Sequence, residues 1–265
     1  MARKVEATTT MHIFNLPMGR SWTPTTSMLF LMTLVLLTMS VPIAQGQDPT
    51  TMNGGSCLAM AGNGCVVLAV DKRFGSGPQM VNVVPRKVMM PPHSQVMVAF
   101  TGLEGDIQSL MLELQIQVES KTSRGTLLST SDPRHERHRR ISPRAMACLT
   151  SHILYNRRAS PYYVEPLVVG VDEDTQEPFL CAHDVIGARS QSKAFVCAGV
   201  ATMSMYGIAE ALWRPNLDAE ELVQVCGKAF LSALERDCLS GYGAILYLMT
   251  KDGMIQEIEL VCRND

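Results

Sequence analysis

The chain of 265 residues lacks the patterns that define several large functional classes. Its 23 Lys and Arg nearly balance its 25 Asp and Glu, for a net charge of −2, so no overall positive field favours nucleic acid or an anionic membrane as a partner. No glycine-rich fingerprint joins an expected strand to an expected helix, which argues against a dinucleotide-binding fold. No Asn-x-Ser/Thr sequon occurs, which disfavours a glycosylated, secreted surface.

The eight cysteines form no CxxC pair, and none lies at metal-ligand spacing with a histidine, so no metal site is expected. Several cysteines lie in apolar runs, where a free thiol behaves as a small buried side chain. Their dispersed positions favour reduced thiols. An even number also fits a secreted, disulfide-bonded globular protein, and this remains an alternative.

No apolar run is long enough to span a membrane. The 14 residues from Met28 to Val41 would form a helix of about 21 Å, shorter than the hydrocarbon core of about 30 Å. Together with Ala44-Gln45-Gly46, this run resembles the end of a signal peptide, but the signal would be longer than usual. We therefore expect residues 1–52 to be a propeptide-like or signal-like N-terminal extension and residues 53–265 to be the folded domain.

Periodicity predicts strands and then helices in the first half of this domain. Asn63-Gly64 between two apolar runs is typical of a β-hairpin. Apolar residues at helical spacing predict a helix over 106–119, and Ser142-Pro143 predicts the start of a second helix. Residues 121–140 are polar and are expected to form a loop. The strands expected in this half lie at 57–61, 65–70, 80–84 and 95–100.

The same order is expected again in the second half. Helical spacing predicts a helix over 203–213, and Asp218 with Glu221 resembles a capping box that begins another. Separate blocks of strands and helices indicate an α+β domain, in which antiparallel sheets are flanked by helices. The strands expected here lie at 166–171, 178–183, 193–198, 244–249 and 254–261, the last two joined across Asp252-Gly253.

Seven strings of residues, in order along 53–265, resemble one known family. They are similar to the β-type subunits of the 20S proteasome, in the N-terminal nucleophile hydrolase superfamily, and most of all to the non-catalytic β3 type (type-3 β subunits). The resemblance implies a four-layer αββα sandwich, which agrees with the expected order of elements. The strings are Asn53-Gly54-Gly55, Asp71-Lys72-Arg73-Phe74-Gly75, Gln79-Met80-Val81, Pro161-Tyr162-Tyr163-Val164-Glu165-Pro166, Tyr206-Gly207, Trp213-Arg214-Pro215-Asn216 and Arg236-Asp237-Cys238-Leu239-Ser240-Gly241.

The resemblance also implies which site residues are present and which are missing. Active relatives use an N-terminal threonine as nucleophile, with an aspartate 16 positions and a lysine 32 positions after it. Asp71 and Lys87 fit this spacing, but Gly55 stands at the threonine position and Val200 at the position of a supporting serine. The resemblance therefore implies no catalytic residue, and a vestigial pocket in which Asp71 and Lys87 form a buried ion pair. Its members are Asp71, Lys87, Asp237 and Ser240.

Two residues near Gly55 keep open the alternative of an active hydrolase. Thr51 lies 20 positions before Asp71, four too many, and Cys57 lies 14 before it, two too few. His135 and His138 could suggest a metal, but the arginines around them oppose a cation. Their tract is expected to be a solvated loop, an insertion relative to typical family members.

The resemblance further implies partners and location. The expected partners are the other α and β subunits of stacked seven-membered rings, with unfolded polypeptide as an indirect substrate. The resemblance implies no cofactor, and neither nucleic acid nor a membrane span is expected. The expected location is the cytoplasm and nucleus, with secretion through residues 28–46 as the less favoured alternative.

Overall fold

The computed structural model describes residues 48–83, 87–92, 94–126 and 140–262. The apolar run 28–41, the tract with His135 and His138, and most of the expected extension lie outside the described residues. Among the helices in the described ranges, none combines the length and the apolar character needed to cross a membrane.

The first sheet has five antiparallel strands in the order β10-β1-β2-β11-β12. The hairpin predicted at Asn63-Gly64 is confirmed, since β1 and β2 pair across it with Ala61 opposite Val66. The hairpin predicted across Asp252-Gly253 is confirmed in the same way between β11 and β12. The strands are β1 (Ser56–Ala61), β2 (Cys65–Asp71), β10 (Phe195–Gly199), β11 (Ala244–Thr250) and β12 (Ile255–Leu260).

The second sheet has the order β5-β6-β7-β8-β9, and its neighbouring strands are also antiparallel. A separate two-stranded ribbon, β3 (Arg73–Ser76) with β4 (Gln79–Val83), continues from the end of β2. The strands of the second sheet are β5 (Val88–Met89), β6 (Val96–Gly102), β7 (Val164–Val171), β8 (Pro178–His183) and β9 (Arg189–Ser192).

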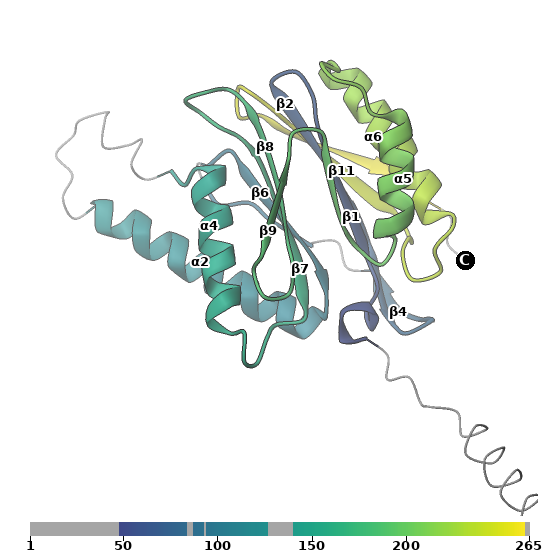
Figure 1. Cartoon of the computed structure of the whole chain (residues 1–265), viewed down its shortest axis with the longest axis horizontal. Helices are drawn as coiled ribbons and strands as arrows, with labels where there is room; N and C mark the ends of the chain where they lie inside the picture. The colour runs from purple at the N-terminus through teal and green to yellow at the C-terminus, as the bar shows by residue number, and fades with distance from the viewer. Residues whose placement is uncertain (1–47, 84–86, 93, 127–139, 263–265) are drawn as a thin grey trace, which may run out of the picture. The chain divides into compact units, whose positions relative to one another are not determined.

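Two pairs of helices cover the outer faces of the sheets (Figure 1). α5 (Thr202–Leu212) and α6 (Ala219–Leu234) pack on the first sheet, where Phe230 and Leu246 belong to one buried cluster. α2 (Glu104–Thr126) and α4 (Pro143–Asn156) pack on the second sheet. The only other helical segment in the described ranges is a short 3₁₀ turn, η1 (Pro49–Thr51).

A third buried cluster fills the space between the sheets. Leu68 of β2 and Val169 of β7 belong to it, and both are fully buried. Because β2 and β7 bury one face against the partner sheet and the other against helices, these two strands are almost entirely apolar on both faces. The predicted α+β fold, a four-layer αββα sandwich, is confirmed.

Two local predictions differ from the structure, and a third is confirmed. The prediction that a polar loop begins at residue 121 was wrong, since α2 continues to Thr126. Ser142 caps α4 as predicted, because its Oγ accepts a hydrogen bond from Ala145 N at 3.3 Å. Asp218 stands at the N-cap of α6, but its side chain makes no capping hydrogen bond, so the predicted capping box was wrong.

Candidate functional site

The register of the first sheet brings the predicted site residues together at one end of β1 and β2. Asp71 is the last residue of β2 and stands opposite Ala244, where β11 begins. Ser56 begins β1 and stands opposite Gly199 at the end of β10. Lys87 lies immediately before β5 of the other sheet, so the site lies where the two sheets face each other.

Asp71 and Lys87 form a buried ion pair. Lys87 Nζ lies 2.8 Å from Asp71 Oδ1 and donates a second hydrogen bond to the Arg73 carbonyl at 2.6 Å. The other donors to Asp71 are backbone amides, of Ser56 to Oδ1 at 3.1 Å and of Gly241 to Oδ2 at 3.2 Å. The residues are only 2% and 5% exposed, so each charge is compensated mainly by the other.

Gly55 lies directly against this pair. Its φ is +100°, and a Cβ built on it would lie 2.7 Å from Lys87 Nζ and 3.2 Å from Asp71 Oδ1. Its N–H donates to the Leu239 carbonyl at 2.9 Å, and its carbonyl accepts from Val200 N at 3.1 Å. The ammonium of Lys87 therefore occupies space that a side chain at position 55 would need.

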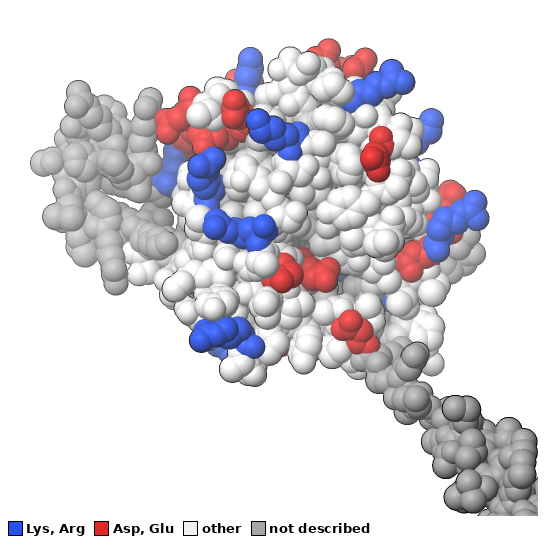
Figure 2. Space-filling model, in the orientation of Figure 1, with Lys and Arg blue, Asp and Glu red and all other residues white. Residues whose placement is uncertain are grey.

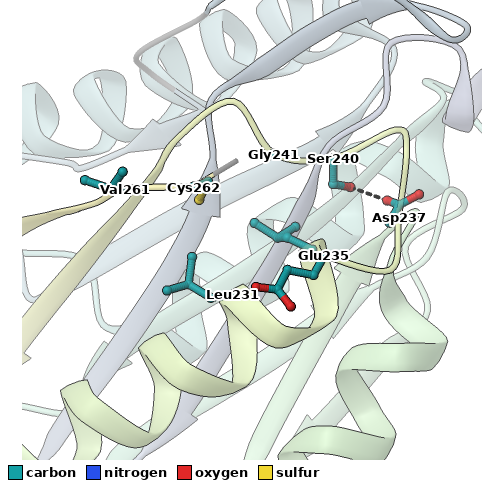
Figure 3. Close-up of a pocket in the computed structure, with 8 residues that line it drawn as sticks. Leu231, Glu235, Asp237, Ser240, Gly241, Val261 and Cys262 are labelled. Atoms are coloured by element: carbon teal, nitrogen blue, oxygen red, sulfur yellow. Dashed lines mark hydrogen bonds between the residues drawn. The ribbon is translucent and has the colours of Figure 1, made fainter. Parts of the chain in front are cut away.

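A chain of hydroxyl groups runs beside the ion pair. Ser56 Oγ accepts from Ala201 N at 3.0 Å and lies 2.7 Å from Ser240 Oγ. Ser240 in turn donates to Asp237 Oδ2, as Figure 3 shows. Because each hydroxyl has one hydrogen, Ser56 donates to Ser240. Asp237 and Ser240 thus do not contact the ion pair directly. Ser240 is connected to it through Ser56, whose backbone amide donates to Asp71, and the amide of the next residue, Gly241, also donates to Asp71.

Arg73 fixes the chain that precedes Gly55. Its side chain is buried, and its guanidinium donates to the carbonyls of Asn53 and Leu239, both at 3.3 Å, and of Gly77 at 2.7 Å. Asn53 also donates from Nδ2 to the Gly75 carbonyl, and its Oδ1 accepts from Glu104 N, both at 2.9 Å. Residues 53–55 are therefore held on both sides, by the β3–β4 ribbon and by the loop before β11.

Neither alternative nucleophile is arranged for attack. Thr51 lies in η1, where its hydroxyl donates to the Asp48 carbonyl at 2.9 Å. Cys57 is fully buried, and burial raises its pKa well above the ordinary value, with further raising by Cys197 and Asp71 and an opposing effect of Lys87. Since the thiolate is the nucleophilic form, Cys57 stays an unreactive thiol near neutral pH.

The cavity next to Asp237 and Ser240 is small. Its volume is about 90 Å³, and Leu231, Glu235, Val261 and Cys262 lie around it (Figure 3). Sites for small molecules usually measure about 300–1,000 Å³, so this cavity is below the size typical of such sites. Within the described ranges, no group of three or more His, Cys, Asp or Glu residues could hold a metal ion.

Two antiparallel sheets between two helix layers form the four-layer αββα sandwich of the N-terminal nucleophile hydrolase fold, and the buried aspartate–lysine pair lies beside the start of β1. The chain belongs to the proteasome family, since the family model described as "Proteasome subunit" matches residues 51–249. The resemblance expected from the seven sequence strings is confirmed.

Curated relatives agree on one type of subunit. The chain is 38% identical over 209 residues to "Proteasome subunit beta type-3" of Trypanosoma brucei brucei, covering 78% of this chain and 95% of that protein. It is 35% identical to the protein of the same name from Drosophila melanogaster, covering 80% and 97%, and 34% identical to that of Saccharomyces cerevisiae, covering 79% and 95%. These matches do not favour a secreted, disulfide-bonded protein, and all eight cysteines, which lie in the described ranges, are free.

Proposed function

We propose that the chain is a non-catalytic, structural type-3 β subunit of the 20S proteasome core. In this role it completes a ring of β subunits that stacks on a second β ring and on α rings in the cytoplasm and nucleus. Unfolded polypeptide is cut by neighbouring subunits, and this chain contacts the substrate only indirectly. No cofactor takes part. The proposal assigns to this chain the subunit type that the names of its relatives give.

The observation that carries the proposal is the position of Gly55 against Lys87. A side chain at residue 55 would point at the Lys87 ammonium, which is where a hydroxyl nucleophile would need its base. Glycine has no atom that can accept an acyl group. In subtilisin, removing the nucleophile alone lowers turnover on the order of 10⁶-fold, so the surviving Asp71 and Lys87 are not expected to sustain hydrolysis.

The groups that would assist a nucleophile at position 55 are also incomplete, as the proposal requires. Val200 has no hydroxyl and contributes only its backbone N–H, to the Gly55 carbonyl. Asp237 and Ser240 are satisfied by one another and by Ser56. We therefore infer a structural role for Asp71, Lys87, Asp237 and Ser240, in which they hold the ends of β1, β2 and β11 together.

The surface fits a subunit that packs among others. Figure 2 shows lysine, arginine, aspartate and glutamate interspersed on one face, without a single large region of one sign. Large apolar side chains are exposed on β4, on α2 and at the start of α5, as expected for contacts between unlike surfaces that close a ring. They are Val81, Val83, Leu112, Ile116 and Met203.

We also propose that residues 1–52 form an N-terminal extension of the domain 53–265, and that the junction, residues 51–54, stays uncleaved and held against the domain. The Met52 carbonyl accepts from Gly77 N at 2.8 Å, and the Asn53 carbonyl accepts from Gly75 N at 3.1 Å. A Cβ at Gly54 would lie 2.1 Å from the Leu239 carbonyl oxygen, so the chain passes here without room for a side chain. These contacts pack the peptide bond before Gly55 against the loop before β11.

Purification of the native complex through a tag on this chain tests the proposal. We expect the tagged chain to elute as part of a large particle that contains α-type and β-type proteasome subunits. The intact mass of the chain is expected to include residues 51–54, because their hydrogen bonds stabilise the uncleaved form. A chain recovered only as a free monomer, or a mature chain that begins at Gly55, would contradict the proposal.

A further inference from the structure

His183 is a buried histidine that lies apart from the Asp71–Lys87 site. It is the last residue of β8 and is only 4% exposed. Because side chains alternate along a strand, it shares a face with Phe179 and Cys181, which belong to the buried cluster between the second sheet and its helices. α4 lies over this face (Figure 1), so the ring of His183 is enclosed between the strand and the helix.

Both ring nitrogens of His183 face carbonyl oxygens. Nε2 lies 3.0 Å from the carbonyl oxygen of Ala147 on α4, and Nδ1 lies 3.3 Å from that of Pro166 on β7. A neutral imidazole carries one N–H, so it donates to only one of these two oxygens. The shorter contact assigns this hydrogen to Nε2, and the lone pair of Nδ1 then faces the Pro166 carbonyl. Only an imidazolium could donate to both oxygens.

A second polar contact shows how closely α4 packs here. Ser151 Oγ on α4 donates to the carbonyl of Gly187, in the turn after β8, at 2.6 Å. A Cβ added to Gly187 would lie 2.5 Å from the Ser151 carbonyl oxygen, so the helix and the turn have no space between them. Water can therefore surround the imidazole of His183 only if α4 moves away from the sheet.

The charges around His183 compensate an imidazolium poorly. Arg189 stands opposite His183 in the register of β8 and β9, and its positive charge disfavours protonation. Asp184 favours protonation, but its carboxylate already accepts from two amides of the β8–β9 turn, at 3.0 and 2.7 Å. Glu165, on the opposite face of β7, accepts from an amide of the first sheet at 3.1 Å. The charged or titratable residues next to the contacts of His183 are Arg144 and Cys148 on α4, Glu165 on β7, Cys181 and Asp184 at β8, and Arg189 on β9.

Protonation of His183 is therefore less favourable in the folded chain than in the unfolded one. Burial lowers the pKa of His183 below its ordinary value of 6.5, and Arg189 lowers it further. The Ala147 and Pro166 carbonyls and the Asp184 carboxylate raise this pKa, but they do not outweigh burial. The stability that His183 contributes is thus complete above about pH 6.5, and it is lost as the pH falls from there towards the pKa of the folded state.

We propose that His183 is a pH-sensitive tie that holds α4 on the second sheet near neutral pH and releases it in acid. In the neutral state, Nε2 donates to the Ala147 carbonyl and the ring packs among apolar side chains. When a proton from solvent binds to Nδ1, the ring carries a charge whose two hydrogen-bond partners are uncharged carbonyls. This charge is more stable in water than in the cluster, so acidification favours an open position of α4.

Hydrogen exchange of the full chain in its native complex tests the proposal. Protection of the α4 amides, corrected for the intrinsic exchange rate, is measured by mass spectrometry at about pH 7.5 and about pH 5.5, on either side of the ordinary histidine pKa. We expect the protection to fall by up to about tenfold, the limit for one proton taken up over one pH unit. α6 packs on the other sheet and is the internal control, which is expected to change less. An unchanged protection of α4, or an equal loss in α6, would overturn the proposal.

Two histidine variants identify the group that is responsible. His183→Gln keeps an N–H that can donate to the Ala147 carbonyl but does not titrate, so the pH dependence of α4 protection is expected to disappear. His152→Gln is the matched control, because His152 lies on α4 itself and is exposed, with its Nε2 3.1 Å from Asn156 Nδ2. It is expected to leave the pH dependence unchanged. A pH dependence that persists in His183→Gln, or that disappears in His152→Gln, would contradict the assignment to His183.

A measurement on the unsubstituted chain does not depend on whether a variant folds. Slow deuterium exchange at the imidazole carbon Cε1, followed in peptides by mass spectrometry, gives the titration midpoint of an individual histidine. We expect the midpoint of His183 to lie below the ordinary value of about 6.5. A midpoint at or above that value would mean that the bond to the Pro166 carbonyl outweighs burial, and that acid strengthens the tie instead of releasing it.

Discussion

Replacing Asp71 with alanine is expected to lower the free energy of unfolding of the chain by about 3–5 kcal/mol, the loss typical of a broken buried ion pair. The substitution leaves the Lys87 ammonium buried without its carboxylate, with only the Arg73 carbonyl as acceptor. It also removes the acceptor of the Ser56 and Gly241 amides. Urea unfolding of the full-length chain, followed by Trp fluorescence, measures the change.

A second ion pair in the same chain provides the control. Lys72 Nζ lies 2.8 Å from Glu259 Oε1, the same separation as in the buried pair, but the Glu259 side chain is 79% exposed. Since water and salt screen exposed pairs, Glu259→Gln is expected to change stability little. If Asp71→Ala cost no more than Glu259→Gln, a structural role for the buried pair would be wrong.

A double variant tests whether Asp71 and Lys87 stabilise the chain as a pair or independently. Lys87→Met leaves the Asp71 carboxylate with two amide donors, and Asp71→Asn with Lys87→Met removes both charges while keeping similar volumes. We expect the double variant to lose less stability than the sum of the two single variants, with a coupling of about 0.5–3 kcal/mol. Additive losses would indicate that the two residues act independently.

Placing a threonine at position 55, where active relatives have their nucleophile, is not expected to create activity. Gly55→Thr requires a β-branched residue at a φ of +100°, with its Cβ 2.7 Å from Lys87 Nζ. Backbone strain of this kind costs about 1–3 kcal/mol, and Lys87 would have to leave the carboxylate of Asp71. We expect the variant to be less stable than the native chain and to show no peptide hydrolysis, even when combined with Val200→Ser.

Gly207→Ala is the matched control for this substitution. Gly207 lies within α5 and has open space where a Cβ would be added. Because alanine is more favourable than glycine in a helix by about 1 kcal/mol, Gly207→Ala is expected to be neutral or stabilising.

Hydrolysis of a fluorogenic peptide is measured in particles whose other active subunits are blocked. Activity that appears with Gly55→Thr would mean that the pocket can still accept a nucleophile.

The sequence predicted most elements of the fold but misjudged those without an apolar pattern. The Asn63-Gly64 hairpin and the Ser142 cap have strong local signals, and both are present. β9 (Arg189–Ser192) is exposed and polar, so no alternation marks it as a strand. α2 extends past its last buried apolar residue, Val118, and this polar final part looks like a loop in sequence.

The site was predicted less completely than the fold. The spacing of Asp71 and Lys87 is informative only through the family resemblance, since local periodicity does not bring the end of β2 to the start of another sheet. Ser56 and Arg73 were missed because their roles depend on backbone amides and carbonyls from distant loops. The left-handed φ of Gly55 could have been suspected from Gly54-Gly55, but the proximity of Lys87 could not.

Covalent labelling of the native particle tests most directly whether this chain lacks a nucleophile. The particle is treated with an excess of a peptide epoxyketone, and each subunit is then analysed by mass spectrometry for the adduct. We predict adducts on other chains of the particle and none on this one. An adduct on Thr51, Ser56 or Cys57 would show that the chain carries a working nucleophile and would contradict the account.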